Sequence, residues 1–71
     1  MILVFRTSIG DESEVEKIAP ALDHLIGNTG SWNVDLEDCD NILRVVTDQV
    51  NVNEIALALI SKGYFCEELE D

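Results

Sequence analysis

Three stretches of the chain read as strands, in which successive side chains point to opposite faces with a period of two. In residues 2–8, Leu3 and Phe5 share the face that we expect to enter the core. Residues 32–37 alternate in the same way, with Trp32 as a core residue, and residues 42–47 form the third stretch. We also expect a short last strand at residues 65–69, with Phe65 and Leu69 facing inward.

Two other stretches repeat their apolar residues every three or four positions, as amphipathic helices do. The first carries a continuous stripe, which comprises Val15, Ile18, Ala19, Leu22, Leu25 and Ile26. Pro20 interrupts it, but the stripe continues in phase, so we predict a kinked helix rather than a broken one. The second helix carries Ile55, Ala58 and Leu59 on its inner side, with Val52 at its start.

Capping signals set the expected starts of both helices. Asp11-x-x-Glu14 and Ser13-x-x-Glu16 both fit a capping box before the first helix, and Asn51-x-x-Glu54 fits one before the second. Turns are expected at residues 27–30, at the polar hairpin of residues 38–41 and at Gly63, and the acidic residues 70–71 should fray.

The predicted element order is βαββαβ, which is the split βαβ or ferredoxin-like motif. Right-handed crossovers then give an α+β fold in which a four-stranded antiparallel sheet carries both helices on one face. The spatial strand order should be fourth, first, third, second. We expect residues 1–71 to form one such domain, because 71 residues suffice for a single small core.

The chain is strongly acidic, with 15 acidic residues against 4 basic ones and a formal net charge of −11. This balance disfavours binding to nucleic acid or to anionic membrane surfaces, because proteins bind both through clusters of lysine and arginine. The apolar start at residues 1–5 is far shorter than the roughly 18 residues that span a bilayer, so we expect a cytoplasmic protein. Its two cysteines, Cys39 and Cys66, should stay thiols on opposite sides of the sheet.

Residues 8–22 read Ser-Ile-Gly-Asp-Glu-Ser-Glu-Val-Glu-Lys-Ile-Ala-Pro-Ala-Leu. This stretch resembles the heavy-metal-associated domain of copper chaperones and metal-transporting ATPases, which reads Gly-Met-x-Cys-x-x-Cys-Val-x-x-Ile-x-x-Ala-Leu. The residues that match are Val15, Ile18, Ala21 and Leu22, and Ile9 replaces the family's buried methionine. Residues 34–37, 53–55, 58–59 and 63–64 resemble the family's later segments. The resemblance implies the same ferredoxin-like fold over nearly the whole chain.

Asp11 and Glu14 stand where that family has its two metal-binding cysteines. Soft thiolates select Cu(I), and two carboxylates do not make such a site, so the family's metal transfer does not carry over. We interpret both residues mainly as helix caps. The alternative is a noncanonical, oxygen-rich site that binds a harder cation at this loop.

Catalytic motifs are missing from the sequence. A single histidine, His24, supports neither a serine–histidine–carboxylate set nor a paired metal site, and we expect it on the outer flank of its helix. Glycine-rich phosphate loops are absent as well. We therefore expect no enzyme and no cofactor.

The sheet face opposite the helices is the candidate interaction surface. We call it the open sheet face, and its expected members are Ile2, Val4, Arg6, Ile42, Arg44 and Val46. Asp35, Glu37 and Glu68 on the edge strands are candidates to pair with its arginines. An ordinary solvated sheet face is one interpretation; the other, which we adopt as the functional hypothesis, is a non-catalytic binding or adaptor module that meets a protein partner or a second copy.

Overall fold

The computed structural model describes residues 1–27, 30–48 and 50–69 of the chain. In these ranges the elements are β1 (Ile2–Thr7), α1 (Glu12–Ile26), β2 (Ser31–Asp35), β3 (Ile42–Val46), α2 (Val52–Ile60) and β4 (Cys66–Glu68). The predicted βαββαβ order is confirmed. The middle of the expected turn at residues 27–30 and the acidic end at residues 70–71 lie outside the described residues.

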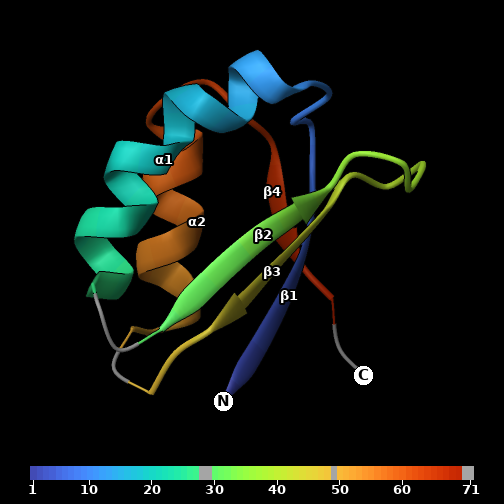
Figure 1. Ribbon diagram of the computed structural model, residues 1–71. Helices are drawn as coiled ribbons and strands as arrows, with labels where there is room; N and C mark the ends of the chain where they lie inside the picture. The colour runs from blue at the N-terminus through green and yellow to red at the C-terminus, as the bar shows by residue number, and fades with distance from the viewer. Residues whose placement is uncertain (28–29, 49, 70–71) are drawn as a thin grey trace.

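The four strands form one antiparallel sheet in the order β2-β3-β1-β4, as predicted. Both helices cover the same face of this sheet, and the described residues place no helix on the other face (Figure 1). The register between the central strands sets Phe5 opposite Leu43 and Leu3 opposite Val45. Since opposite residues of an antiparallel pair point to one face, these four side chains form the floor of the core.

The core is one cluster between the sheet and the two helices. Its buried members are Leu3, Phe5, Ile9, Ile18, Leu22, Ile26, Leu43, Val45, Val50, Ile55 and Leu59. Trp32, Val34 and Leu36 pack against it but stay only partly buried. The periodic stripes in the sequence thus mark the core correctly, although β2 contributes to it from an edge.

Helix α1 is capped at its start by Asp11 and passes through Pro20 without a break. Its axis changes direction along its length (Figure 1), and it ends at Gly27, whose φ of 68° favours glycine. Helix α2 starts with the predicted capping box, in which Asn51 and Glu54 exchange hydrogen bonds. Within the described residues, neither helix has the length and apolar character that crossing a bilayer requires.

The expected inward orientation of Phe65 and Leu69 is wrong. Strand β4 starts at Cys66, which lies opposite Thr7, while Glu67 lies opposite Arg6 on the open sheet face. Because side chains alternate, Phe65 and Leu69 fall in the row of Glu67, and the thiol of Cys66 packs against the core instead. Phe65 is held at this register by its N–H, which donates to Ser8 Oγ at 2.8 Å. A shift of one residue reverses every side chain of a strand.

Candidate functional site

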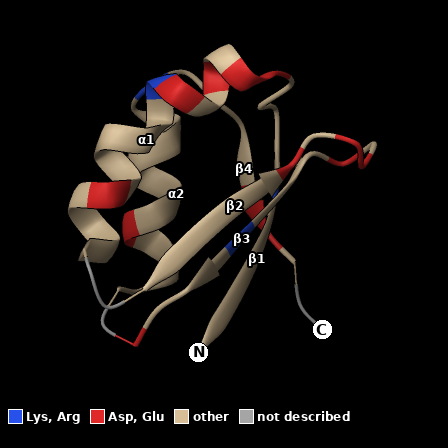
Figure 2. Ribbon diagram, viewed as in Figure 1, with Lys and Arg blue, Asp and Glu red and all other residues tan. Residues whose placement is uncertain are grey.

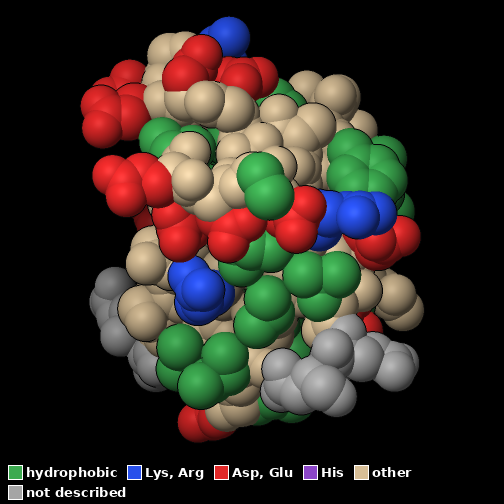
Figure 3. Space-filling model, turned by 90° about the vertical axis from the view of Figure 1, so that its right-hand side faces the viewer, with side chains coloured by type: hydrophobic (Ala, Val, Ile, Leu, Met, Phe, Trp, Pro, Cys, Tyr) green, Lys and Arg blue, Asp and Glu red, His purple; other side chains and the backbone are tan. Residues whose placement is uncertain are grey.

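The open sheet face is built by the pairing of β1 with β3. Ile2 lies opposite Val46, Val4 opposite Arg44, and Arg6 opposite Ile42, so the side chains of all six predicted residues point to one face of the sheet. Figure 3 shows this face, where hydrophobic side chains gather in the lower half and charged side chains border them. The structure therefore brings the predicted set together.

The six residues of the open sheet face differ in how much of each side chain is exposed to solvent. Ile2 is 65% exposed and Val46 is 44% exposed, whereas Ile42 is only 7% exposed although it lies on the same face of the sheet. The accessible apolar area thus lies at the end of the face where β1 begins and β3 ends. Alternation in the sequence identifies the face of each residue but says nothing about which neighbours cover it.

Both arginines of the open sheet face have acidic neighbours. Arg6 Nη2 lies 2.8 Å from Glu67 Oε1, and Arg44 Nη1 lies 4.0 Å from Asp35 Oδ2. The expected partner Asp35 is thus found, while β4 presents Glu67 to this face rather than Glu68. These side chains are about half exposed, so each pair contributes at most about 1 kcal/mol to stability. Their main effect is to neutralise the two cations locally.

Phe65 also belongs to this surface, although the sequence pattern predicted that it faces the core. Its ring lies under the guanidinium of Arg6, 5.8 Å from Cζ to the ring centroid, and its side chain is 50% exposed. A cation above an aromatic face is an attractive contact. A pair of opposite charges between Arg6 and Glu67 fits this register, but Glu68 offers Arg6 the same charge, so the sequence does not decide between the two.

At the first turn, Asp11 and Glu14 cap α1. Asp11 Oδ1 accepts hydrogen bonds from the Ser13 hydroxyl at 2.7 Å and from the Glu14 N–H at 2.9 Å. These two bonds favour the charged carboxylate and lower the pKa of Asp11. Glu14 Oε1 accepts from the Gly10 N–H at 2.9 Å. Of the two candidate capping patterns, α1 uses the one that starts at Asp11.

Three connections meet at this end of the sheet, as the fold predicts. Thr7 Oγ1 donates to the Asn41 carbonyl of the β2–β3 hairpin at 2.7 Å, and the Ser8 N–H donates to the Phe65 carbonyl at 3.2 Å. Acidic residues gather at the start of α1 and on the hairpin (Figure 2). Hydrogen bonds therefore join the three connections at this end of the molecule, where acidic residues are concentrated.

The two thiols are free and differ in environment. Cys39 is exposed on the hairpin, whereas Cys66 is partly buried, and burial raises the pKa of its thiol to about 11. Asp38, Cys39 and Asp40 place one ligand atom each within 4.8 Å of one another, so they are a geometrically feasible cation cluster. Asp38 also accepts the Asp40 N–H at 2.8 Å, which accounts for the turn. His24 is exposed on α1, as expected.

Comparisons of this chain with protein-family models, with curated proteins and with solved structures find no match.

Proposed function

We propose that this chain is a small non-catalytic binding or adaptor module that meets a protein partner through the open sheet face. The observation that carries the proposal is the pair Ile2 and Val46, two large apolar side chains that lie side by side and exposed on the face of the sheet opposite α1 and α2. Phe65, beside Arg6 at the other end of this face, is a further exposed apolar side chain. Full burial of one such side chain contributes about 1.5–3 kcal/mol, which is enough to make it an anchor.

The partner that fits this surface is a different protein with basic residues around an apolar centre. A second copy of this chain would bring another net charge of −11 to the contact, and like charges oppose association. The arginines of the open sheet face are already paired with Glu67 and Asp35, so they do not offset the excess of the chain's other acidic residues. A basic rim on the partner would compensate them.

The resemblance to heavy-metal-associated domains extends this proposal. We infer that the chain keeps that family's architecture without its thiolate site and acts in the cytoplasm, where Cys39 and Cys66 would remain reduced. The alternative, a metal-handling role for Asp11 and Glu14, gains no support from their contacts, because both carboxylates already accept hydrogen bonds from the turn and the start of α1.

The proposal is tested by capturing partners with two matched double variants. Ile2→Lys/Val46→Lys changes the open sheet face, and Leu57→Lys/Ile60→Lys changes two side chains of α2 that are 64% and 54% exposed. Both variants add the same charge and remove similar apolar area. We expect the first to lose a basic protein that the wild type and the second variant retain, with at least tenfold weaker binding by the purified pair.

Thermal unfolding of both variants establishes that they fold. Equal retention of the partner by both double variants would contradict the proposal, and so would loss confined to the α2 variant. Sedimentation of the wild type should give a monomer at high concentration; a stable dimer would show that the face serves a second copy instead.

A further inference from the structure

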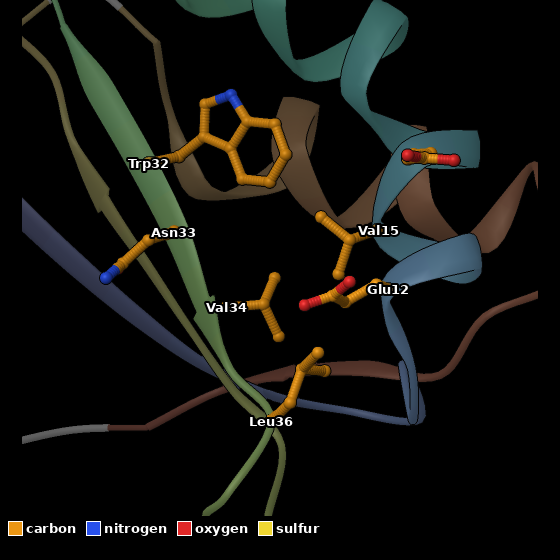
Figure 4. A pocket seen from close by; sticks show the side chains of 7 residues that line it. Glu12, Val15, Trp32, Asn33, Val34 and Leu36 are labelled. Atoms are coloured by element: carbon orange, nitrogen blue, oxygen red, sulfur yellow. The ribbon is translucent and has the colours of Figure 1, made fainter.

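A groove lies beside the edge strand β2, on the helix side of the sheet. We call it the β2 groove; it has a volume of about 450 Å³ and is lined by Glu12, Val15 and Glu16 of α1 and by Trp32, Val34 and Leu36 along β2 and just beyond it. Figure 4 shows Trp32 and Val34 of β2, and Leu36 just after it, projecting toward Val15 and Glu12. The Asn33 side chain points to the opposite side of the strand. The β2 groove thus has an apolar floor and an acidic rim.

The walls of the β2 groove are held in place. The indole N–H of Trp32 donates to Asp23 Oδ1 at 2.9 Å, which ties the edge strand to α1. Val34 and Leu36 pack against the core from one side and remain partly exposed on the other. A ligand that enters here would therefore cover apolar surface without first ordering the side chains that form it, which lowers the cost of binding.

The backbone of β2 borders the same groove. β2 ends the sheet order on one side, so its outer N–H and C=O groups have no neighbouring strand among the described residues. Natural edge strands are commonly protected by lysine, proline or very short length. Residues Ser31–Asp35 contain neither proline nor lysine. At the other edge, β4 has three residues and two of them are acidic. The β2 edge is the more open of the two.

We propose that the β2 edge binds an extended basic segment of a partner protein as a fifth, added strand. An added strand lies about 4.8 Å from its neighbour and sends alternate side chains to each face of the sheet. On the helix side, apolar residues at the centre of the segment then fill the β2 groove, and lysine or arginine residues on the same side near its ends reach Glu12 and Glu16 at the rim. Since β2 has five residues, the bound segment has about the same length. This surface is separate from the open sheet face.

The test uses the full chain and a defined probe, a capped eight-residue peptide of sequence Lys-Thr-Val-Thr-Val-Thr-Lys-Thr, in which valine and both lysines share one face of an extended strand. Trp32 is the single tryptophan of the chain, so its fluorescence should change on saturable binding, and backbone NMR shifts should concentrate in β2 and the first turns of α1. A peptide with glutamate in place of lysine should not bind. The Glu16→Gln variant should bind roughly two- to fivefold more weakly at low salt. Glu68→Gln removes an exposed acid from the other edge and should bind as the wild type does.

Two N-methylated versions of the peptide separate strand addition from simple adhesion. One carries N-methyl groups at the odd positions and the other at the even positions. A strand presents alternate N–H groups to its neighbour, so one version should lose binding and the other should keep it. Equal binding by both versions would overturn the proposal. Shifts outside β2 and α1, equal weakening by Glu16→Gln and Glu68→Gln, or no saturable change at millimolar peptide would overturn it as well.

Discussion

At Gly30, a single added methyl group should lower the stability of the fold more than its small size would suggest. Gly30 lies where the chain enters β2. A Cβ built there would overlap the carbonyl oxygen of Val46 and lie 2.6 Å from Ile26 Cγ2. One obstacle is backbone of the neighbouring strand, and the other belongs to a side chain that is only 4% exposed. Neither can move away without disturbing the core or the sheet.

The expected effect of Gly30→Ala follows from two opposing terms. Forcing an extra carbon into a packed site costs about 1–3 kcal/mol. Replacing glycine restricts the unfolded chain, which offsets about 0.4–1 kcal/mol of that cost. The variant should therefore lose about 1–2 kcal/mol of unfolding free energy, and its Tm should fall by roughly 5–15 °C for a domain of this size.

Circular dichroism during thermal and urea unfolding measures this loss. Gly10→Ala is the matched control, because a Cβ at Gly10 would meet only Glu14 Oε1, at an ordinary 3.5 Å. The control should be neutral or slightly stabilising. If Gly30→Ala were as stable as the wild type, the close approach between the start of β2 and the end of β3 would be refuted.

Three further predictions concern the caps and the thiols. Asn51→Ala removes the side-chain acceptor of the α2 capping box and should lower the unfolding free energy by about 1 kcal/mol in urea titrations; an unchanged midpoint would count against the box. The pKa of Asp11 is lowered from 3.8 by its bonds to Ser13 and Glu14, so its stabilisation is present above pH 4 and is lost as pH falls through the folded pKa. Asp11→Asn should therefore lose less stability between pH 6 and pH 2 than the wild type, and an equal loss would contradict this. The thiol of Cys66 has a pKa of about 11, so only about one such thiol in a thousand is ionised at pH 8. Peptide mapping after iodoacetamide treatment should therefore find Cys39 alkylated first. Alkylation of Cys66 before Cys39 would contradict this prediction.

The elements and the core follow from local patterns in the sequence, while the last strand does not. The stripe from Val15 to Ile26 and the capping residues Asp11 and Asn51 determine the helices through contacts within a few residues. The face of β4 depends instead on the bond from the Phe65 N–H to Ser8, which lies 57 positions away. Three residues are too few for alternation to give the register.

The candidate site divides in the same way. Membership of the open sheet face follows from the period of two, so all six residues were predictable. The burial of Ile42 and the exposure of Phe65 depend on neighbouring strands, so they could not be predicted from the same pattern. The β2 groove also escapes prediction, because it arises from the position of α1 over an edge strand rather than from any motif.

Binding of a basic protein partner at the open sheet face is the central claim. NMR cross-saturation tests it most directly, with methyl-labelled protein in complex with the captured partner and saturation applied to the partner. We expect transfer to the methyl groups of Ile2, Val4 and Val46, with Leu57 and Ile60 unaffected. Transfer to Leu57 and Ile60 with Ile2 and Val46 unaffected would contradict it.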